Sequence, residues 1–455
     1  MTVYADSERF FGKSDSETLQ NAIDYAEKAG CPRIVIPRRN ARAESDVWTI
    51  EKTLLLPSDL TVILDGAHLR LADGVVENIF RNRNAWTEEG RTLAGEQHGI
   101  RIIGECGAIL DGGNPNGMCE QLLRDNPGKY PSMLRNVPIF LHNVRDLEVR
   151  GIRFTDTRYW AVTLMYCRWG RLSELDFRMY GTLENQDGID LRIGCEYVTI
   201  ENVTGITGDD TVALTALPPN RGLAPGALSV EGKTIDIHDV TIRNITSASH
   251  GNHIVRFLNE NGAKIYNVTV SDVKDTGEAI SGATIIFGTT DPYLMQTPHA
   301  MGDFRNITVR NVISRAQRAL DICESCENLL IENVVAEGET EMGIRFRKNF
   351  SAKNVTIRDF VLSPDKTADS LADAECPPEA LSDVKLKNFR AKNLRILYRG
   401  APLRINGLTS DDPTESIFRE DHARLASAYG RYFHSAYGKV IENRPKDNRF
   451  QEKKS

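Results

Sequence analysis

Three short segments bring acidic, amide and histidine side chains close together along the chain. They are LENQDGIDL (183–191), ITGDDTVAL (206–214) and SASHGNHIVRF (247–257). Hydrolysis of a glycosidic bond needs one protonated carboxylic acid and one ionised carboxylate. These two states can coexist in a cluster, because neighbouring acids raise one another's pKa and keep one of them protonated. The segments therefore indicate acid–base chemistry on a sugar.

The spacing of the acids predicts that they meet if the chain forms stacked coils. Asp187 and Asp209 are 22 residues apart (209 − 187), the length of one minimal coil. Since neighbouring coils lie about 4.8 Å apart, Asp187, Asp209, Asp210 and His250 would share one face within about 10 Å. This suits an inverting mechanism, in which two carboxyl groups stand about 6.5–9.5 Å apart around a water. A calcium site and plain corner turns are the other interpretations.

Other residues near these segments are expected to contact the substrate. Arg192 and Arg256 could each bind a carboxylate of a sugar, or pair with an acid on the surface. Aromatic residues could stack on sugar rings, although Trp160 fits an inward core position at least as well. The predicted substrate-binding set is Asn185, Arg192, His253, Arg256, Tyr159 and Tyr293.

A repeat of the form apolar-x-apolar-x-Asn/Asp-apolar predicts the fold. It occurs in VTIENV, VTIRNI, VTVSDV, ITVRNV, LLIENV, VTIRDF and VKLKNF, with Asn or Asp at 202, 244, 272, 311, 333, 359 and 388. By subtraction the spacings are 42, 28, 39, 22, 26 and 29 residues, typical of stacked coils with inserted loops. Each copy turns two or three apolar side chains inward, and Asn or Asp suits a tight corner. We expect an all-β chain folded as a right-handed parallel β-helix.

The two ends of this stack should be covered, because a bare terminal coil would expose strand edges. Ser14 and Glu17 have capping-box spacing, and the apolar periodicity up to Gly30 predicts a capping helix over 16–29. The β-helix is expected to span 1–410. The segment 411–455 is predicted to be a helical tail that covers the last coil or meets another subunit to form a homo-oligomer.

Composition and charge argue against several classes of function. The 455 residues include 56 basic and 63 acidic side chains, and a net charge of −7 gives no basic footprint for nucleic acid. No window approaches the roughly 20 apolar residues of a membrane span. No signal peptide is recognised, so a cytoplasmic location is expected. The only C-x-x-C pair, Cys323 and Cys326, has no partner set for zinc, and we expect neither metal nor cofactor.

The stretch from about 139 to 257 resembles the polygalacturonase family of pectin-degrading hydrolases (glycoside hydrolase family 28). TRYWAVTLMYC, NQDGIDL, GDDTVAL and SHG follow in the order of that family's NSPxWxxxxxxC, N-T-D-G, G/Q-D-D and G-H-G motifs, and LDGGN at 110–114 resembles its I-D-G-x-G. The resemblance implies a parallel β-helix and a metal-free hydrolytic mechanism.

The same resemblance implies a role for each matching residue. It makes Asp209 the general acid, and it makes Asp187 and Asp210 the pair that holds the attacking water. It also implies that His250 organises the acid by hydrogen bonding. The predicted catalytic residues are therefore Asp187, Asp209, Asp210 and His250.

Two features depart from that family. Its R-I-K signature, which grips a galacturonate carboxylate, is replaced by SGATIIFGTTD, and the similar GIRFRK at 343–348 lies about two coils further along. Arg256 could take over this contact. The 40 residues from Asp210 to His250 (250 − 210) exceed one coil, and the excess fits the loop ALPPNRGLAPGALSVEG. With a second long loop at 287–303, it would wall the ends of the cleft and favour exo action.

The leading interpretation is an inverting, exo-acting glycoside hydrolase whose substrate is an oligosaccharide or polysaccharide, pectin-related but not necessarily a galacturonate. A lyase or an intramolecular sugar transferase on the same scaffold is the alternative, because one architecture hosts many chemistries. A non-catalytic carbohydrate-binding solenoid is a third reading, against which the clustered aspartates argue. The anomeric form of the product and the absorbance of an unsaturated product would separate the first two.

Overall fold

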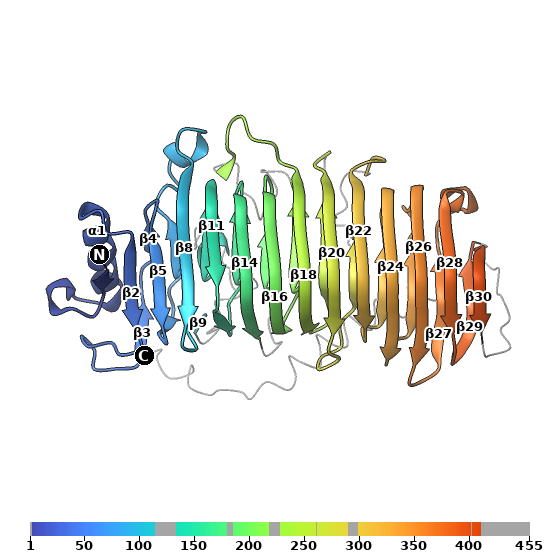
Figure 1. Ribbon diagram of the computed structural model, residues 1–455, viewed down its shortest axis with the longest axis horizontal. Coiled ribbons are helices and arrows are strands. Elements are labelled where there is room, and N and C mark those ends of the chain that lie inside the picture. Colours follow the sequence, from blue (N-terminus) through green and yellow to red (C-terminus); the bar gives the residue numbers. More distant parts are fainter. Residues whose placement is uncertain are drawn as a thin grey trace, which may run out of the picture.

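The chain forms one long stack of parallel strands, seen from the side in the computed structural model (Figure 1). The structure describes residues 2–113, 133–179, 185–217, 228–260, 262–289, 299–401 and 403–410. In most coils one long strand leads into one short strand of a second sheet, and the chain then returns to the first. Such crossovers between parallel strands are right-handed. The predicted right-handed parallel β-helix is confirmed.

The first sheet holds the long strands and most strands of the first coils. Among the described residues these are β1 (Val3–Tyr4), β2 (Arg33–Pro37), β3 (Val47–Ile50), β5 (Thr61–Asp65), β6 (His68–Leu71), β8 (Gln97–Glu105), β9 (Ile109–Asp111), β11 (Val144–Arg150), β12 (Arg153–Thr155), β14 (Arg168–Arg178), β16 (Glu196–Thr207), β18 (Ile237–Ser249), β20 (Ile265–Asp275), β22 (Phe304–Ser314), β24 (Cys326–Gly338), β26 (Ala352–Pro364), β28 (Val384–Ala391) and β30 (Ile405–Ser410).

The second sheet holds the short strands that carry the candidate site. Among the described residues they follow one another in the order β4 (Leu54–Leu56), β7 (Phe80–Asn82), β10 (Ile139–His142), β13 (Val162–Met165), β15 (Ile189–Leu191), β17 (Val212–Ala216), β19 (His253–Asn259), β21 (Ala283–Phe287), β23 (Arg318–Ile322), β25 (Met342–Phe346), β27 (Ala368–Ala374) and β29 (Leu394–Gly400).

Asparagine and aspartate residues turn the corners inside the long strands. The seven predicted corner residues, at 202, 244, 272, 311, 333, 359 and 388, have φ between 55° and 58°. Most side chains are strained in this left-handed region, but Asn and Asp tolerate it. The amides also bond from coil to coil: Asn244 Nδ2 donates to Asn202 Oδ1 at 2.6 Å. The predicted corner role of the repeat is confirmed.

Helix α1 (Asp15–Lys28) covers the first coil at the blue end of the stack (Figure 1). The Ser14 hydroxyl accepts from the backbone N–H of Glu17, as the capping-box spacing predicts. The apolar face of the helix, which includes Leu19 and Ile23, is buried. The predicted tail, 411–455, lies outside the described residues. No helix in the described part of the chain has the length and apolar run of a membrane span.

Candidate active site

The strand register brings the predicted acids together. Asp187 precedes β15, Asp209 and Asp210 precede β17, and His253 opens β19. The pairing of β15, β17 and β19 places Asp210 between Asp187 and His253 on three successive strands. One carboxylate oxygen from each aspartate lies within 4.8 Å of the other two. The three acids therefore form one cluster, which is tighter than the predicted separation of about 6.5–9.5 Å.

Asp210 is held as a carboxylate. Its Oδ1 accepts from the backbone N–H of His253 at 3.1 Å and lies 2.7 Å from His253 Nδ1. Its Oδ2 accepts from Arg256 Nη1 at 3.1 Å. Burial alone would raise the pKa of Asp210, but Arg256 and His253 outweigh it and hold that pKa below the usual range. Asp210 can therefore act only as the ionised member of the cluster.

Asp209 has the opposite tendency although it is the adjacent residue. Burial, and then the negative charge of Asp210, raise the pKa of Asp209 to about 7. Its carboxyl oxygens accept backbone N–H groups from Asn185 at 3.1 Å and Asp210 at 3.0 Å. Its own carbonyl accepts from the hydroxyls of Thr207 and Ser249, both at 2.7 Å. A rigid carboxyl that is half protonated at neutral pH suits a proton donor.

The floor of the site, formed by Asp187, Asp190 and Arg192, contains buried polar atoms without hydrogen-bond partners. Burial, followed by the charges of Asp209, Asp190 and Asp210, raises the pKa of Asp187 well above its usual range. Within the described residues, Asp187 Oδ1, Asp190 Oδ2, and Nε and Nη2 of Arg192 have no partner. Since buried polar atoms are normally paired, this floor is suited to a polar ligand or water.

Asp190 is a site residue that the sequence analysis did not select. Its register partner on β17 is Ala213, and the partner of Ala213 on β19 is Arg256. Asp190 and Arg256 therefore lie on either side of the small Ala213 side chain. The Asp-x-x-Asp spacing from Asp187 to Asp190 is the signal in the sequence that could have identified it.

The histidine that contacts the acids is His253, and the prediction for His250 is corrected. The side chain of His250 is exposed, and in the described part of the chain no hydrogen bond joins its ring to the aspartates. Partial burial lowers the pKa of His250. Gly251, with φ of 92°, turns the chain after His250, and His253 then enters the sheet opposite Asp210.

Two further predicted contacts, those of Tyr159 and Arg192, change when the side chains are placed, whereas Trp160 takes the inward core position that was expected. Tyr159 is fully buried, so it offers no ring face to a sugar and its predicted stacking role is corrected. Trp160 is also buried, 4.5 Å from the ring of Tyr159, and Arg192 lies over it at 4.6 Å. Arg192 is only 2% exposed, so it supports the floor and does not reach into solvent. Tyr293 lies outside the described residues.

The strand after His253 carries no basic side chain toward the site. In β21, Ala283 and Ile286 are the register partners of His253 and Arg256, and they pack with Cys323 in an apolar cluster. Arg345, from the GIRFRK segment, lies on β25, two coils beyond β21, and pairs with Glu375. The prediction that this segment lies too far along to replace the family's basic pair is thereby confirmed.

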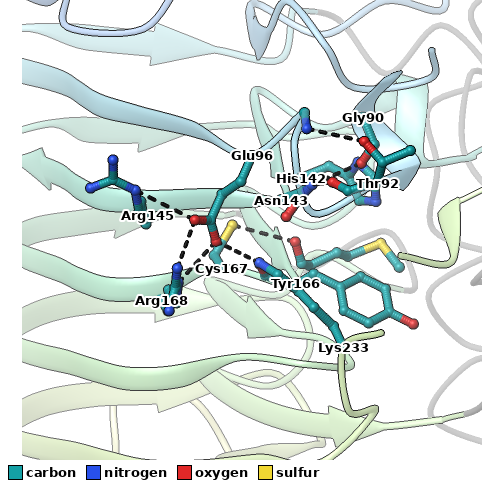
Figure 2. Close-up of polar contacts among 12 residues, drawn as sticks. Gly90, Thr92, Glu96, His142, Asn143, Arg145, Tyr166, Cys167, Arg168 and Lys233 are labelled. Atoms are coloured by element: carbon teal, nitrogen blue, oxygen red, sulfur yellow. Dashed lines mark hydrogen bonds and ion pairs between the residues drawn. The ribbon is translucent and has the colours of Figure 1, made fainter. Parts of the chain in front are cut away.

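An ion-pair network fixes the segment that follows β17 (Figure 2). Lys233 Nζ donates to Glu96 Oε1 at 2.7 Å, and Arg168 and Arg145 approach the same carboxylate at 2.7 and 3.4 Å. Burial alone would raise the pKa of Glu96, but its bonds to Arg168 and Lys233 outweigh burial and lower it. The network holds one end of the loop predicted to wall the cleft. Residues 218–227 of this loop lie outside the described residues, as do residues 290–298 of the second loop.

Comparison with known proteins shows the fold and leaves the chemistry open. Neither a family model nor a curated protein sequence matches the chain. The A-module of the mannuronan C-5 epimerase AlgE6 from Azotobacter vinelandii is similar in structure, with a TM-score of 0.58, 11% identity, and 90% and 100% of the two chains covered. The family 28 exopolygalacturonase of Yersinia enterocolitica has a TM-score of 0.54, 13% identity and coverages of 92% and 79%. PfbA, a surface adhesin of Streptococcus pneumoniae, has a TM-score of 0.50, 11% identity and coverages of 93% and 96%.

Proposed function

We propose that the chain hydrolyses a glycosidic bond of an oligosaccharide by a metal-free acid–base mechanism. The observation that carries this proposal is the opposite protonation preference of two adjacent carboxyls. The pKa of Asp209 is raised to about 7, so this carboxyl keeps its proton below neutral pH. The pKa of Asp210 is instead lowered by Arg256 and His253. A pair of acids whose environments push their pKa values apart is the arrangement that glycoside hydrolysis requires.

In the proposed reaction Asp209 donates its proton to the glycosidic oxygen as the bond from that oxygen to the anomeric carbon breaks. A water held by Asp210 and Asp187 attacks the anomeric carbon, forms the new C–O bond and passes a proton to Asp210. Solvent then returns the two carboxyls to their resting states. The products are two sugars, one carrying the hydroxyl of the water.

Inversion at the anomeric carbon is the outcome that this cluster favours, in spite of its short separation. A retaining enzyme needs a carboxylate that can attack the sugar directly. Both oxygens of Asp210 are occupied by His253 and Arg256, and the residue is 1% exposed. A carboxylate fixed in this way is better suited to orienting a water than to forming a glycosyl ester.

The sugar at the scissile bond is proposed to carry no carboxylate, and the substrate need not be a galacturonate. Arg256 already pairs with Asp210 at 3.1 Å, and Ala283 and Ile286 on the next strand are apolar. A uronate bound here would face the acidic cluster, and Arg256, the cation that contacts this cluster, is already paired with Asp210. Buried charges without a partner are costly, so a neutral sugar fits better.

The test is to incubate the protein with a panel of neutral and acidic oligosaccharides and to follow the fresh products by NMR. Hydrolysis with inversion is expected, and it should disappear in Asp209→Asn. Asp359→Asn is a matched control, because other corners of the β-helix carry Asn at the equivalent position. An unsaturated product that absorbs in the ultraviolet would instead establish the lyase reaction. A transglycosylated ring product would establish the transferase.

A further inference from the structure

A hollow in the surface lies on the same edge of the stack as the candidate active site. Its volume is about 480 Å³, within the range of small-molecule sites. It is formed by the segments that precede β21, β23, β25 and β27. Asp187, Asp209 and His250 precede β15, β17 and β19 on the same edge of the stack, where the long strands end (Figure 1). The hollow therefore continues the line of the catalytic cluster toward the C-terminal coils.

The hollow begins next to the coil that carries the histidines. The backbone N–H of Gly251 donates to the carbonyl of Ile280 at 2.9 Å, and the N–H of Gly282 donates to the carbonyl of Asn252 at 2.6 Å. Ile280 lines the hollow and is 60% exposed. Strands of one sheet are about 4.8 Å apart, so β21 is about 10 Å from β17 and β25 about 19 Å. A chain of a few sugars bound at Asp209 would reach this hollow.

Arg315 forms the rigid base of the hollow. Its Nη1 donates to the carbonyl of Thr276 at 3.0 Å, and its Nη2 donates to Glu337 Oε1 at 2.8 Å. Gly277 and Gly338 lie on either side of its side chain, and a Cβ at either position would come within 3.1 and 3.4 Å of it. The glycines leave open the space that a side chain would fill. The only cation in the lining is therefore already paired with an acid.

The rim of the hollow is acidic. Glu339, Glu341 and Asp365 line it in addition to the paired Glu337. Glu339 is bound by Lys366, which leaves Glu341 and Asp365 as carboxylates that a ligand can approach. Burial, then the charges of Asp369 and Glu339, raise the pKa of Glu341. Carboxylates only accept hydrogen bonds, so this rim suits a ligand that is rich in donors.

We propose that this hollow is a distal subsite for a sugar unit that carries hydroxyl or protonated amino groups and no carboxylate. A protonated amino sugar would be favoured, because a charge-assisted hydrogen bond to Glu341 or Asp365 is stronger than a neutral one. A uronate would be repelled by the same side chains. The exposed Ile280 offers an apolar surface for the C–H face of the ring. This inference rests on the proposed function for the direction of the sugar chain, whereas the binding itself does not depend on catalysis.

The experiment measures binding by calorimetry on the Asp209→Asn protein, which separates binding from hydrolysis. The probes are a glucosamine tetramer and a galacturonate tetramer. We expect the glucosamine tetramer to bind, Glu341→Lys to weaken its binding at least about tenfold, and the galacturonate tetramer to bind much more weakly. Glu332→Lys is the matched control, since Glu332 lies on the first sheet outside the hollow and pairs with Arg358.

The outcomes distinguish this inference from the proposed function. The glucosamine tetramer could bind and lose affinity in Glu341→Lys, while the wild type hydrolyses no sugar. That result would support the subsite and refute the proposed hydrolase function. Equal affinity for the two tetramers, or no effect of Glu341→Lys beyond that of Glu332→Lys, would overturn the subsite. Binding of calcium that Glu341→Lys abolishes, with no sugar bound, would also overturn it.

Discussion

Replacement of Asp209 by asparagine should abolish activity and yet raise the stability of the folded protein above neutral pH. The folded-state pKa of Asp209 is raised from 3.8 to about 7, so ionisation of this carboxyl opposes folding as the pH rises between those values. Three units correspond to about 4 kcal/mol. Asp209 keeps partial exposure, and solvent screening reduces the expected effect to about 2 kcal/mol.

The amide also loses an interaction. Asp209 accepts one backbone N–H on each oxygen, and asparagine can accept only one of the two without opposing donors. That loss costs about 1 kcal/mol. The variant should therefore be about 1 kcal/mol more stable than the wild type at about pH 8 and about 1 kcal/mol less stable at about pH 2.5, where the wild-type carboxyl is protonated in both states.

Asp210→Asn, one residue away, should have the opposite effect on stability near neutral pH. Its pKa is lowered by Arg256 and His253, so the ionised carboxyl favours folding above the pKa of the unfolded chain. Removal of that charge leaves Arg256 buried without its partner, which should cost about 3–5 kcal/mol near neutral pH. Thermal unfolding of the wild type and both variants at the two pH values measures these three stability differences: that of Asp209→Asn at each pH and that of Asp210→Asn. Equal shifts for the two variants, or destabilisation by Asp209→Asn at both pH values, would refute the assigned protonation states.

The pH dependence, the metal dependence and the Glu96 network can each be tested. First, kcat should fall as the pH rises through about 7, because Asp209 must hold a proton to act as the acid, and a flat pH–rate profile across neutrality would count against it. Second, activity should survive EDTA, because the carboxylate of Asp210 is already paired with Arg256 and bonded to His253, and recovery of a lost activity by calcium would reassign the cluster to a metal site. Third, Glu96→Gln should lower Tm, because it removes the carboxylate that Lys233, Arg168 and Arg145 share, and it should also lower kcat/KM severalfold because the loop predicted to wall the cleft is then held less firmly; an unchanged kcat/KM in the folded variant would separate that loop from function.

The fold could be predicted because the repeat carries two independent signals. Alternating apolar residues define the inward face of each strand, and Asn or Asp marks the corner where φ becomes positive, as at Asn202 and Asn388. A second row of corner residues is not predicted by this repeat. Asn267, Asn306 and Asn328 also have φ near 54°, and their amides bond from coil to coil. These asparagines come before the apolar-x-apolar unit of each repeat, whereas the predicted corner residues come after it.

The sequence predicts which coils carry the candidate site, but it does not predict which side chains on those coils meet. His250 follows the family motif, but register decides which histidine meets Asp210. Alignment of DTVAL with HIVRF, strand against strand, pairs Asp210 with His253 and would have found the contact. Burial of Tyr159 could not be read from its type, because an aromatic ring suits a core and a sugar platform equally.

Adjacent residues at one corner of the β-helix can thus supply both members of an acid–base pair. Asp210 occupies the position that enters β17, where the register aligns it with His253 of the next strand and the side chain of Arg256 reaches its carboxylate. Asp209 lies one residue earlier, in the turn, where its carboxyl meets backbone N–H groups and the charge of Asp210. A change of one residue along the chain therefore moves a carboxyl from a cationic to an anionic surrounding. The two protonation states follow from the geometry of the corner, and the dipeptide Asp-Asp placed elsewhere along a strand would not produce them.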